Sequence, residues 1–164
     1  MVNLESVGGD SMIVIAGGLF GAGYAIYRLV QYQKANKAVK EKFTESQIID
    51  HVNYGMKSGM FNAIMAGLSF SLVLASFDSP SVQALYLMIG GLFIGNVFDA
   101  YRIKRVFFTK TSFYTQQVSV RYKSINKITP KKRGKSSTLE TNQKEVFVFP
   151  KTVIDKINEY SNKK

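Results

Sequence analysis

The stretch SGMFNAIMAGLSFSLVLASF, residues 58–77, decides the fold of this chain because it contains no charged side chain. A helix of about 20 apolar residues spans the hydrocarbon core of a bilayer. Two similar runs flank it: Ser11–Val30 has no charge before Arg28, and Val82–Ala100 carries its one charge, Asp99, near its end. A soluble chain of 164 residues is too small to bury three such runs. We therefore predict three transmembrane helices and not three buried core helices.

The charges test the membrane interpretation independently of hydropathy. If the chain crosses three times, residues 1–10 and the turn 78–81 lie on one side, and residues 31–57 and 102–164 lie on the other. The first side has acidic residues and no lysine or arginine, and all 22 basic residues lie at the end of the first span or on the second side. Loops rich in lysine and arginine stay in the cytoplasm, which places the amino terminus outside and the carboxyl terminus inside. The net charge of +11 is thereby explained without a nucleic-acid partner.

Each predicted span carries small residues four positions apart, which lie on one helix face. Glycine costs roughly 1 kcal/mol relative to alanine inside a helix, and close contact between helix backbones in lipid offsets that cost. The second span has five such residues, so we expect it to be the main packing helix. Whether the contacts form within the chain or with another subunit is left open, as is the alternative that glycine is simply common in membrane helices. The predicted packing residues are Gly17, Gly21, Gly59, Ala63, Gly67, Ser71, Ala75, Gly91 and Gly95.

Three polar side chains, Asn62, Asn96 and Asp99, lie within the predicted spans. An ionisable group inside a membrane is a functional candidate. Asp99 stands three residues before Arg102 at the cytosolic end, which favours an interfacial ion pair. Asn62 and Asn96 stand near the cytosolic ends of antiparallel helices, which favours a hydrogen bond between them over an ion site.

The cytosolic loop 31–57 has helical spacing in both halves. Apolar residues recur at helical intervals from Tyr32 to Phe43, a capping-box pattern follows at Thr44–Gln47, and helical spacing resumes from Ile48 to Met56. We predict a helical hairpin with its tip at residues 43–44. Its lysines face either solvent or anionic lipid headgroups.

The pattern of apolar and polar residues changes after Arg105. Aromatic and β-branched residues alternate with polar ones in 106–122 and again in 145–149, which indicates strands. A basic turn lies at 130–135, and a helix with one apolar face begins near Thr152. The prediction is an α+β membrane protein with an extracytoplasmic segment 1–10, a membrane domain 11–101 and a cytosolic domain 102–164. That last domain is a small antiparallel sheet capped by a C-terminal helix.

The segments FFT at 107–109, VSVRYKSINKI at 118–128 and VFVFP at 146–150, with a basic turn and a final helix, resemble bacterial pleckstrin-homology-like domains attached to small polytopic membrane proteins. The resemblance covers about residues 105–162. It implies a partly open barrel closed by the C-terminal helix, with a conformational step between strands at Tyr122, Ser124, Ile125 and Ile128. It also implies an interaction module, as in small membrane proteins that confer immunity to bacteriocins or accompany a membrane complex.

Residues suited to catalysis or metal binding are scarce. The chain has no cysteine, and its one histidine, His51, lacks a second histidine at metal-binding spacing. The glycines of the first span precede no Gly-Lys-Ser/Thr loop. We predict no enzyme activity, no metal site and no cofactor.

Two function classes remain. The first is a non-catalytic plasma-membrane protein that binds a partner, which is another membrane protein, a peptide or a further copy of the chain, as a toxin immunity protein or an accessory subunit does. The second is an anionic-lipid-sensing or membrane-organising protein that docks through the basic turn. A channel or pore subunit is a third, less favoured class, because the predicted spans lack a charged or hydroxyl-lined face. The basic residues that contact lipid or partner in these hypotheses are Lys131, Lys132, Arg133 and Lys135.

Overall fold

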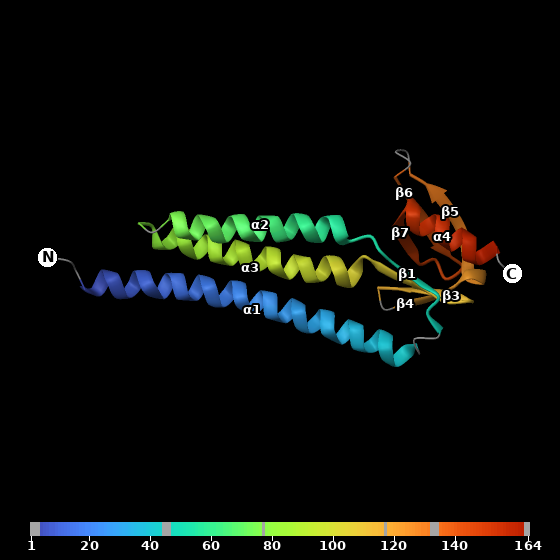
Figure 1. Cartoon of the computed structure of the whole chain (residues 1–164), viewed down its shortest axis with the longest axis horizontal. Coiled ribbons are helices and arrows are strands. Elements are labelled where there is room, and N and C mark those ends of the chain that lie inside the picture. The colour runs from blue at the N-terminus through green and yellow to red at the C-terminus, as the bar shows by residue number, and fades with distance from the viewer. Residues whose placement is uncertain (1–3, 44–46, 77, 117, 132–134, 163–164) are drawn as a thin grey trace. The chain divides into compact units, whose positions relative to one another are not determined.

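The computed structural model describes residues 4–43, 47–76, 78–116, 118–131 and 135–162. Over these residues the chain has an α+β fold with four α-helices, three of them long and apolar, and two small antiparallel sheets (Figure 1). The chain divides into two compact units. Unit 1 comprises residues 1–34 and 56–101, and unit 2 comprises residues 35–55 and 102–164.

The three long helices are α1 (Leu4–Lys42), α2 (Met56–Ala75) and α3 (Pro80–Ile103). Each is long and apolar enough to cross a bilayer. Pro80 opens α3, where its missing N–H and fixed φ suit the first helical position. At 39 residues, α1 extends about 58 Å, nearly twice the hydrocarbon thickness of a bilayer. The last turns of α1, from residue 35, belong to unit 2.

The predicted helical hairpin over residues 31–57 is wrong in its second half. The first arm is the helical end of α1, but the returning arm forms strand β1 (Asp50–Asn53), which pairs antiparallel with β2 (Arg105–Phe108). Ile49 extends the ladder, because its N–H donates to the Phe108 carbonyl at 2.9 Å. Residues 48–53 thus form hydrogen bonds with backbone groups of β2 that would otherwise be unpaired at the sheet edge. This gain outweighs the helical spacing of their apolar side chains. Three of the four residues of the predicted capping box Thr44–Gln47, residues 44–46, lie outside the described residues.

Unit 2 contains two sheets where the sequence predicted one. The first has the order β1-β2-β3-β4, with β3 at Ser112–Thr115 and β4 at Val118–Arg121. The second has the order β5-β6-β7, formed by Ile125–Pro130, Ser136–Thr141 and Val146–Pro150. The chain passes between them through a 3₁₀ turn, η2 (Tyr122–Ser124), which breaks the ladder.

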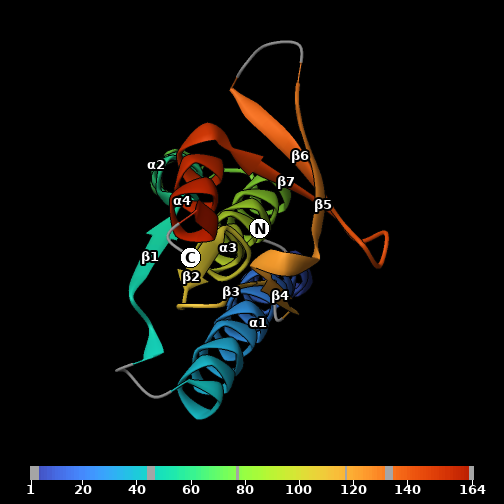
Figure 2. The ribbon, with the colours of Figure 1, turned by 90° about the vertical axis from the view of Figure 1, so that its right-hand side faces the viewer.

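The two sheets share one apolar core with the final helix, α4 (Lys151–Asn162). Phe113 of the first sheet meets Phe149 of the second edge-on, with ring centroids 5.9 Å apart. α4 lies beside β6 and β7 (Figure 2), and its buried residues Val153, Ile154 and Ile157 join the core. The buried Tyr122 anchors the turn η2, because its hydroxyl donates to the Thr109 carbonyl at 3.1 Å.

Candidate functional site

Four glycines, Gly17 and Gly21 of α1 and Gly91 and Gly95 of α3, lie at close contacts between these two helices. An added Cβ at Gly17 would lie 2.6 Å from the Ala84 carbonyl oxygen, and one at Gly91 would overlap the backbone of Gly21. At Gly95 it would overlap the ring of Tyr24. These positions therefore have no room for a side chain, because the opposing atoms are backbone or a packed ring.

The small residues of α2 are placed differently. Gly59 is buried against Tyr101, whose ring carbon lies 2.9 Å from the site of a Cβ. Ala63, Gly67, Ser71 and Ala75 are exposed, and no described atom lies within 4 Å of a Cβ built at Gly67. We call Ala63, Gly67, Ser71 and Ala75 the α2 stripe. Within the described part of the chain, the α2 stripe faces away from the other two long helices, although α2 was expected to be the main packing helix.

The three polar residues of the predicted spans differ in their surroundings. Asp99 forms an ion pair with Arg28 of α1, with 2.9 Å between Oδ2 and Nη1, and Arg28 also donates to the Tyr24 hydroxyl at 2.9 Å. Asn62 donates to the Ser58 carbonyl one turn back on its own helix, and Asn96 is exposed. The expected Asn62–Asn96 hydrogen bond is therefore wrong. The ion pair of Asp99 is formed across helices, with a residue 71 positions earlier.

The basic turn lies between β5 and β6. Lys131 and Lys135 are exposed, and the Lys131 N–H donates to the Ser136 carbonyl at 3.0 Å. Lys132 and Arg133 lie outside the described residues. The two described lysines are accessible to a charged partner from solvent. Their positions do not identify that partner.

A polar cluster ties β1 to α4. Lys156 donates to Oδ2 of Asp50, and the Tyr160 hydroxyl donates to the same oxygen at 3.1 Å. The hydrogen bond from Lys156, above all, lowers the pKa of Asp50, and the same bond raises the pKa of Lys156. The cluster joins chain segments 106 residues apart, which suits a structural role.

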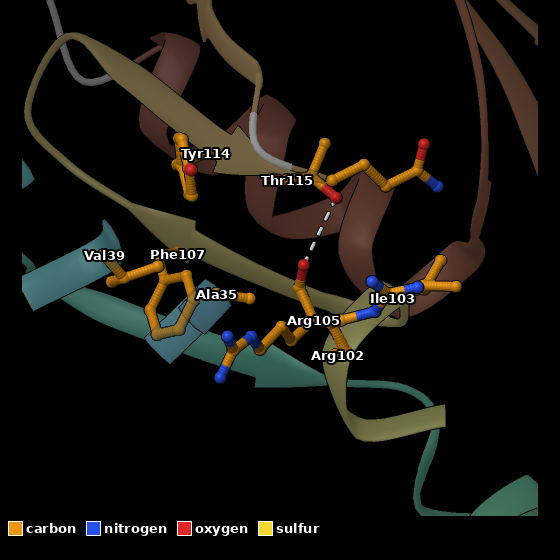
Figure 3. A pocket seen from close by; sticks show the side chains of 9 residues that line it. Ala35, Val39, Arg102, Ile103, Arg105, Phe107, Tyr114 and Thr115 are labelled. Carbon is orange, nitrogen blue, oxygen red and sulfur yellow. Dashed lines mark hydrogen bonds between the residues drawn. The ribbon is translucent and has the colours of Figure 1, made fainter. Parts of the chain in front are cut away.

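A cavity of about 320 Å³ in unit 2 was not predicted from the sequence (Figure 3). The end of α1, the end of α3, strands β2 and β3, and the turn after β3 form its wall. Thr115 of that wall donates to the Arg105 carbonyl at 3.2 Å, as the dashed line in Figure 3 marks. The lining residues are Ala35, Val39, Arg102, Ile103, Arg105, Phe107, Tyr114, Thr115 and Gln116.

Among the described residues, no group of three or more His, Cys, Asp or Glu side chains is placed to hold a metal ion. His51 is exposed on β1 and stacks on Phe107 of the neighbouring strand, with ring centroids 6.2 Å apart. Comparison of the chain with protein-family models, with curated proteins and with solved structures gives no match. The fold and these surfaces define an α+β protein with three apolar helices of membrane-spanning length and a compact β unit.

Proposed function

We propose that this chain is a non-catalytic, multi-pass protein of the plasma membrane that binds a partner through its membrane helices. The observation that carries the proposal is the contrast between the glycine faces. Those of α1 and α3 are occupied by contacts within the chain, whereas the α2 stripe is exposed. Small residues gain contact energy in lipid only when another backbone approaches closely. The α2 stripe therefore suits a helix of another subunit, either a second copy or a different membrane protein.

The membrane topology of the proposal has the amino terminus outside and unit 2 in the cytosol. Its support is the absence of lysine and arginine from residues 1–10 and from the turn 78–81, against 22 basic residues elsewhere. The lengths of the helices fit this topology, because α2 has 20 residues and α3 has 24, and both lengths are sufficient to cross a bilayer.

Unit 2 is proposed to be a pleckstrin-homology-like module. Its support is the arrangement of four antiparallel strands, then three, then a C-terminal helix packed on the shared core. The strand β1 completes this set from residues before the membrane helices α2 and α3, so the module begins earlier than the predicted boundary at residue 102. Such a module in a small membrane protein fits an immunity protein or an accessory subunit. We therefore propose that unit 2 contacts a protein or a peptide.

Cysteine cross-linking tests the proposed association. The chain has no cysteine, so Ala63→Cys reports only on the introduced position. In native membranes we expect Ala63→Cys carrying a maleimide-linked benzophenone, which inserts into C–H bonds of any neighbouring helix on illumination, to give a cross-linked species. Ile64→Cys is the matched control, because this exposed residue lies one position along and about 100° around the helix. Equal cross-linking of both variants, or of neither, contradicts association through the α2 stripe.

A further inference from the structure

Strand β7 forms one edge of the second sheet, whose order is β5-β6-β7. Along such a strand, successive residues direct their backbone N–H and C=O groups alternately toward the neighbouring strand and away from it. Two ladder bonds fix this alternation, because the Thr141 N–H donates to the Glu145 carbonyl at 3.0 Å and the Lys151 N–H donates to the Lys135 carbonyl at 3.3 Å. The odd-numbered residues of β7 therefore bond to β6, and the even-numbered ones direct their backbone groups outward.

The outward backbone groups of Val146 and Val148 have no hydrogen-bond partner among the described residues. Pro150, the next outward residue, has no N–H. Lys144, which precedes the strand, has a φ of 62°, so the extended edge does not continue in that direction. The free edge is thus limited to Val146 and Val148, and an edge of this kind can pair with a strand of another chain.

The opposite edge of the same sheet, at β5, is less suited to pairing. The Lys131 N–H donates to the Ser136 carbonyl at 3.0 Å, so the preceding residue, Pro130, is an outward residue of β5. Proline at such a position removes an outward donor and makes the addition of a strand less favourable. β7 keeps its outward donors at Val146 and Val148, so it is the more open edge of this sheet.

The side chains of β7 point to the same surface. Val146 is 60% exposed and Val148 is 47% exposed, whereas Phe147 between them is buried in the core. In the described part of the chain, no other strand carries an exposed large apolar side chain. A strand added along β7 would cover both valines as well as satisfy their backbone groups.

The edge of β7 is complementary to itself in the antiparallel direction. With a two-fold axis beside Phe147, Val146 of one copy lies opposite Val148 of the other, and symmetry generates the reverse pair. Residues of a hydrogen-bonded antiparallel pair exchange both of their N–H···O=C bonds. This register therefore uses every outward N–H of the two free edges, and it places the valines of the two copies side by side.

The charges at the two ends of β7 also match in this register. Glu145 of one copy lies opposite Phe149 of the other, and the exposed Lys151 stands two positions beyond Phe149. Diagonal neighbours on paired strands lie about 7–8 Å apart, within reach of a lysine side chain. Symmetry forms this contact between opposite charges twice. Parallel pairing in the same register would instead place Lys151 beside Lys151 of the second copy, which is unfavourable.

We propose that β7 pairs antiparallel with β7 of a second copy, so that the two three-stranded sheets become one sheet of six strands. This inference rests on the proposal that unit 2 contacts a protein, and it identifies that protein as another copy of the chain. The surface lies in unit 2 and is distinct from the α2 stripe in unit 1. The paired edge is short, so we expect the pairing at the high local concentration that confinement to a membrane provides.

Amide hydrogen exchange of the full chain, reconstituted in liposomes of neutral lipid, tests the proposal. The exchange rate of each β7 amide is compared at a high and at a low protein-to-lipid ratio. We expect the Val146 and Val148 amides to exchange about tenfold or more slowly at the high ratio, because pairing protects them. The Phe147 and Phe149 amides are the internal control, since they bond to β6 within each copy and should be protected at both ratios.

Val148→Pro removes an N–H that takes no part in the bonds to β6, and edge strands accept proline at such positions. One donor is lost in each copy, so the Val146 amide should exchange as fast at the high ratio as at the low one. Val148→Thr is the matched control, because threonine is also β-branched and keeps the N–H, and it should leave Val146 protected. Protection of Phe147 in Val148→Pro reports that β7 still pairs with β6, and the comparison of ratios in the unaltered protein needs no variant.

Three results overturn the proposal. Exchange of Val146 and Val148 at rates that do not depend on the ratio shows that no second copy covers the edge. Slow exchange of these amides in native membranes, but not in the reconstituted protein, assigns the edge to a different partner. An equal loss of protection in Val148→Pro and Val148→Thr shows that side-chain packing, and not strand pairing, holds the copies together. Cross-linking from Ala63→Cys is measured separately, so failure at β7 leaves the proposed association through the α2 stripe intact, and the reverse.

Discussion

Gly91 of α3 lies against the backbone of Gly21 of α1, so that neither position has room for a side chain. A Cβ at Gly91 would overlap the Gly21 backbone, and a Cβ at Gly21 would lie 2.5 Å from the carbonyl oxygen of Leu87. In the proposed membrane setting, lipid tails are as apolar as leucine, so close packing is the main source of contact energy between these helices. The contact makes glycine a requirement for the approach of α1 to α3.

The first prediction concerns this contact. We expect Gly91→Leu to destabilise unit 1 by about 2–3 kcal/mol or more, because overpacking against backbone leaves no flexible neighbour to move. Gly23→Leu of α1 is the control, since no described atom lies within 4 Å of a Cβ built at Gly23, so that the change should not destabilise unit 1. Thermal unfolding of the purified full chain in neutral detergent measures both. Equal losses in the two variants would contradict the packing role of Gly91.

The long apolar helices were predictable because the signal is local. Each is an apolar run with at most one charge, near its end, and its composition alone is sufficient to identify it. The final helix was predictable for the same reason, since Val153, Ile154 and Ile157 recur at helical spacing and form its buried face.

Strand β1 was not predictable in the same way. Its pairing partner β2 lies more than 50 residues later, and the pattern of residues 48–56 is compatible with helical spacing as well as with a strand. Strand formation depends on the neighbour that a strand meets, more than helix formation does. The cavity was missed for a similar reason, because Ala35, Arg102 and Tyr114 come from three separate segments and no local motif joins them.

The second prediction is a pH dependence of unit 2 from the Asp50–Lys156 pair. The pKa of Asp50 is lowered in the folded state, so its contribution to stability is present above the ordinary aspartate value of 3.8 and is lost as pH falls through the lowered pKa. The pKa of Lys156 is raised, so its contribution is present below 10.5 and is lost as pH rises through the raised pKa.

We therefore expect Asp50→Asn to cost about 1 kcal/mol at neutral pH, the upper range for partly exposed pairs, and to flatten both the acid and the alkaline limb of the stability curve. Urea unfolding from pH 2 to pH 11, followed by circular dichroism of the β unit, measures this. Asp155→Asn is the control. It removes an exposed carboxylate from α4, the helix that carries Lys156, and should leave both limbs of the stability curve unchanged. A full acid limb in Asp50→Asn would show that other groups produce it.

The third prediction concerns the core shared by the two sheets. Phe149 is 1% exposed and contacts Phe113 of the other sheet, so Phe149→Ala should destabilise unit 2 by about 3–5 kcal/mol. Val148→Ala on the same strand is the control, because its side chain is 47% exposed and its loss should cost about 0.5 kcal/mol. Hydrogen exchange of the β5–β7 amides in the full chain distinguishes them. Similar exchange rates in both variants would mean that the sheets do not share a cooperative core.

The last prediction tests the orientation of the chain. If the segments rich in lysine and arginine stay in the cytoplasm, residue 81, at the start of α3, lies outside the cell. Residue 142, between β6 and β7, then lies in the cytosol. Both side chains are exposed, and the chain has no cysteine, so Ser81→Cys and Asn142→Cys each give a single labelling position. In intact cells we expect a membrane-impermeant maleimide to label Ser81→Cys and to leave Asn142→Cys unlabelled until the membrane is opened. Labelling of both positions from outside would show that the β unit is not cytosolic, and labelling of neither would show that the turn 78–81 does not lie outside. The reverse pattern would place the basic residues outside, against the charge distribution.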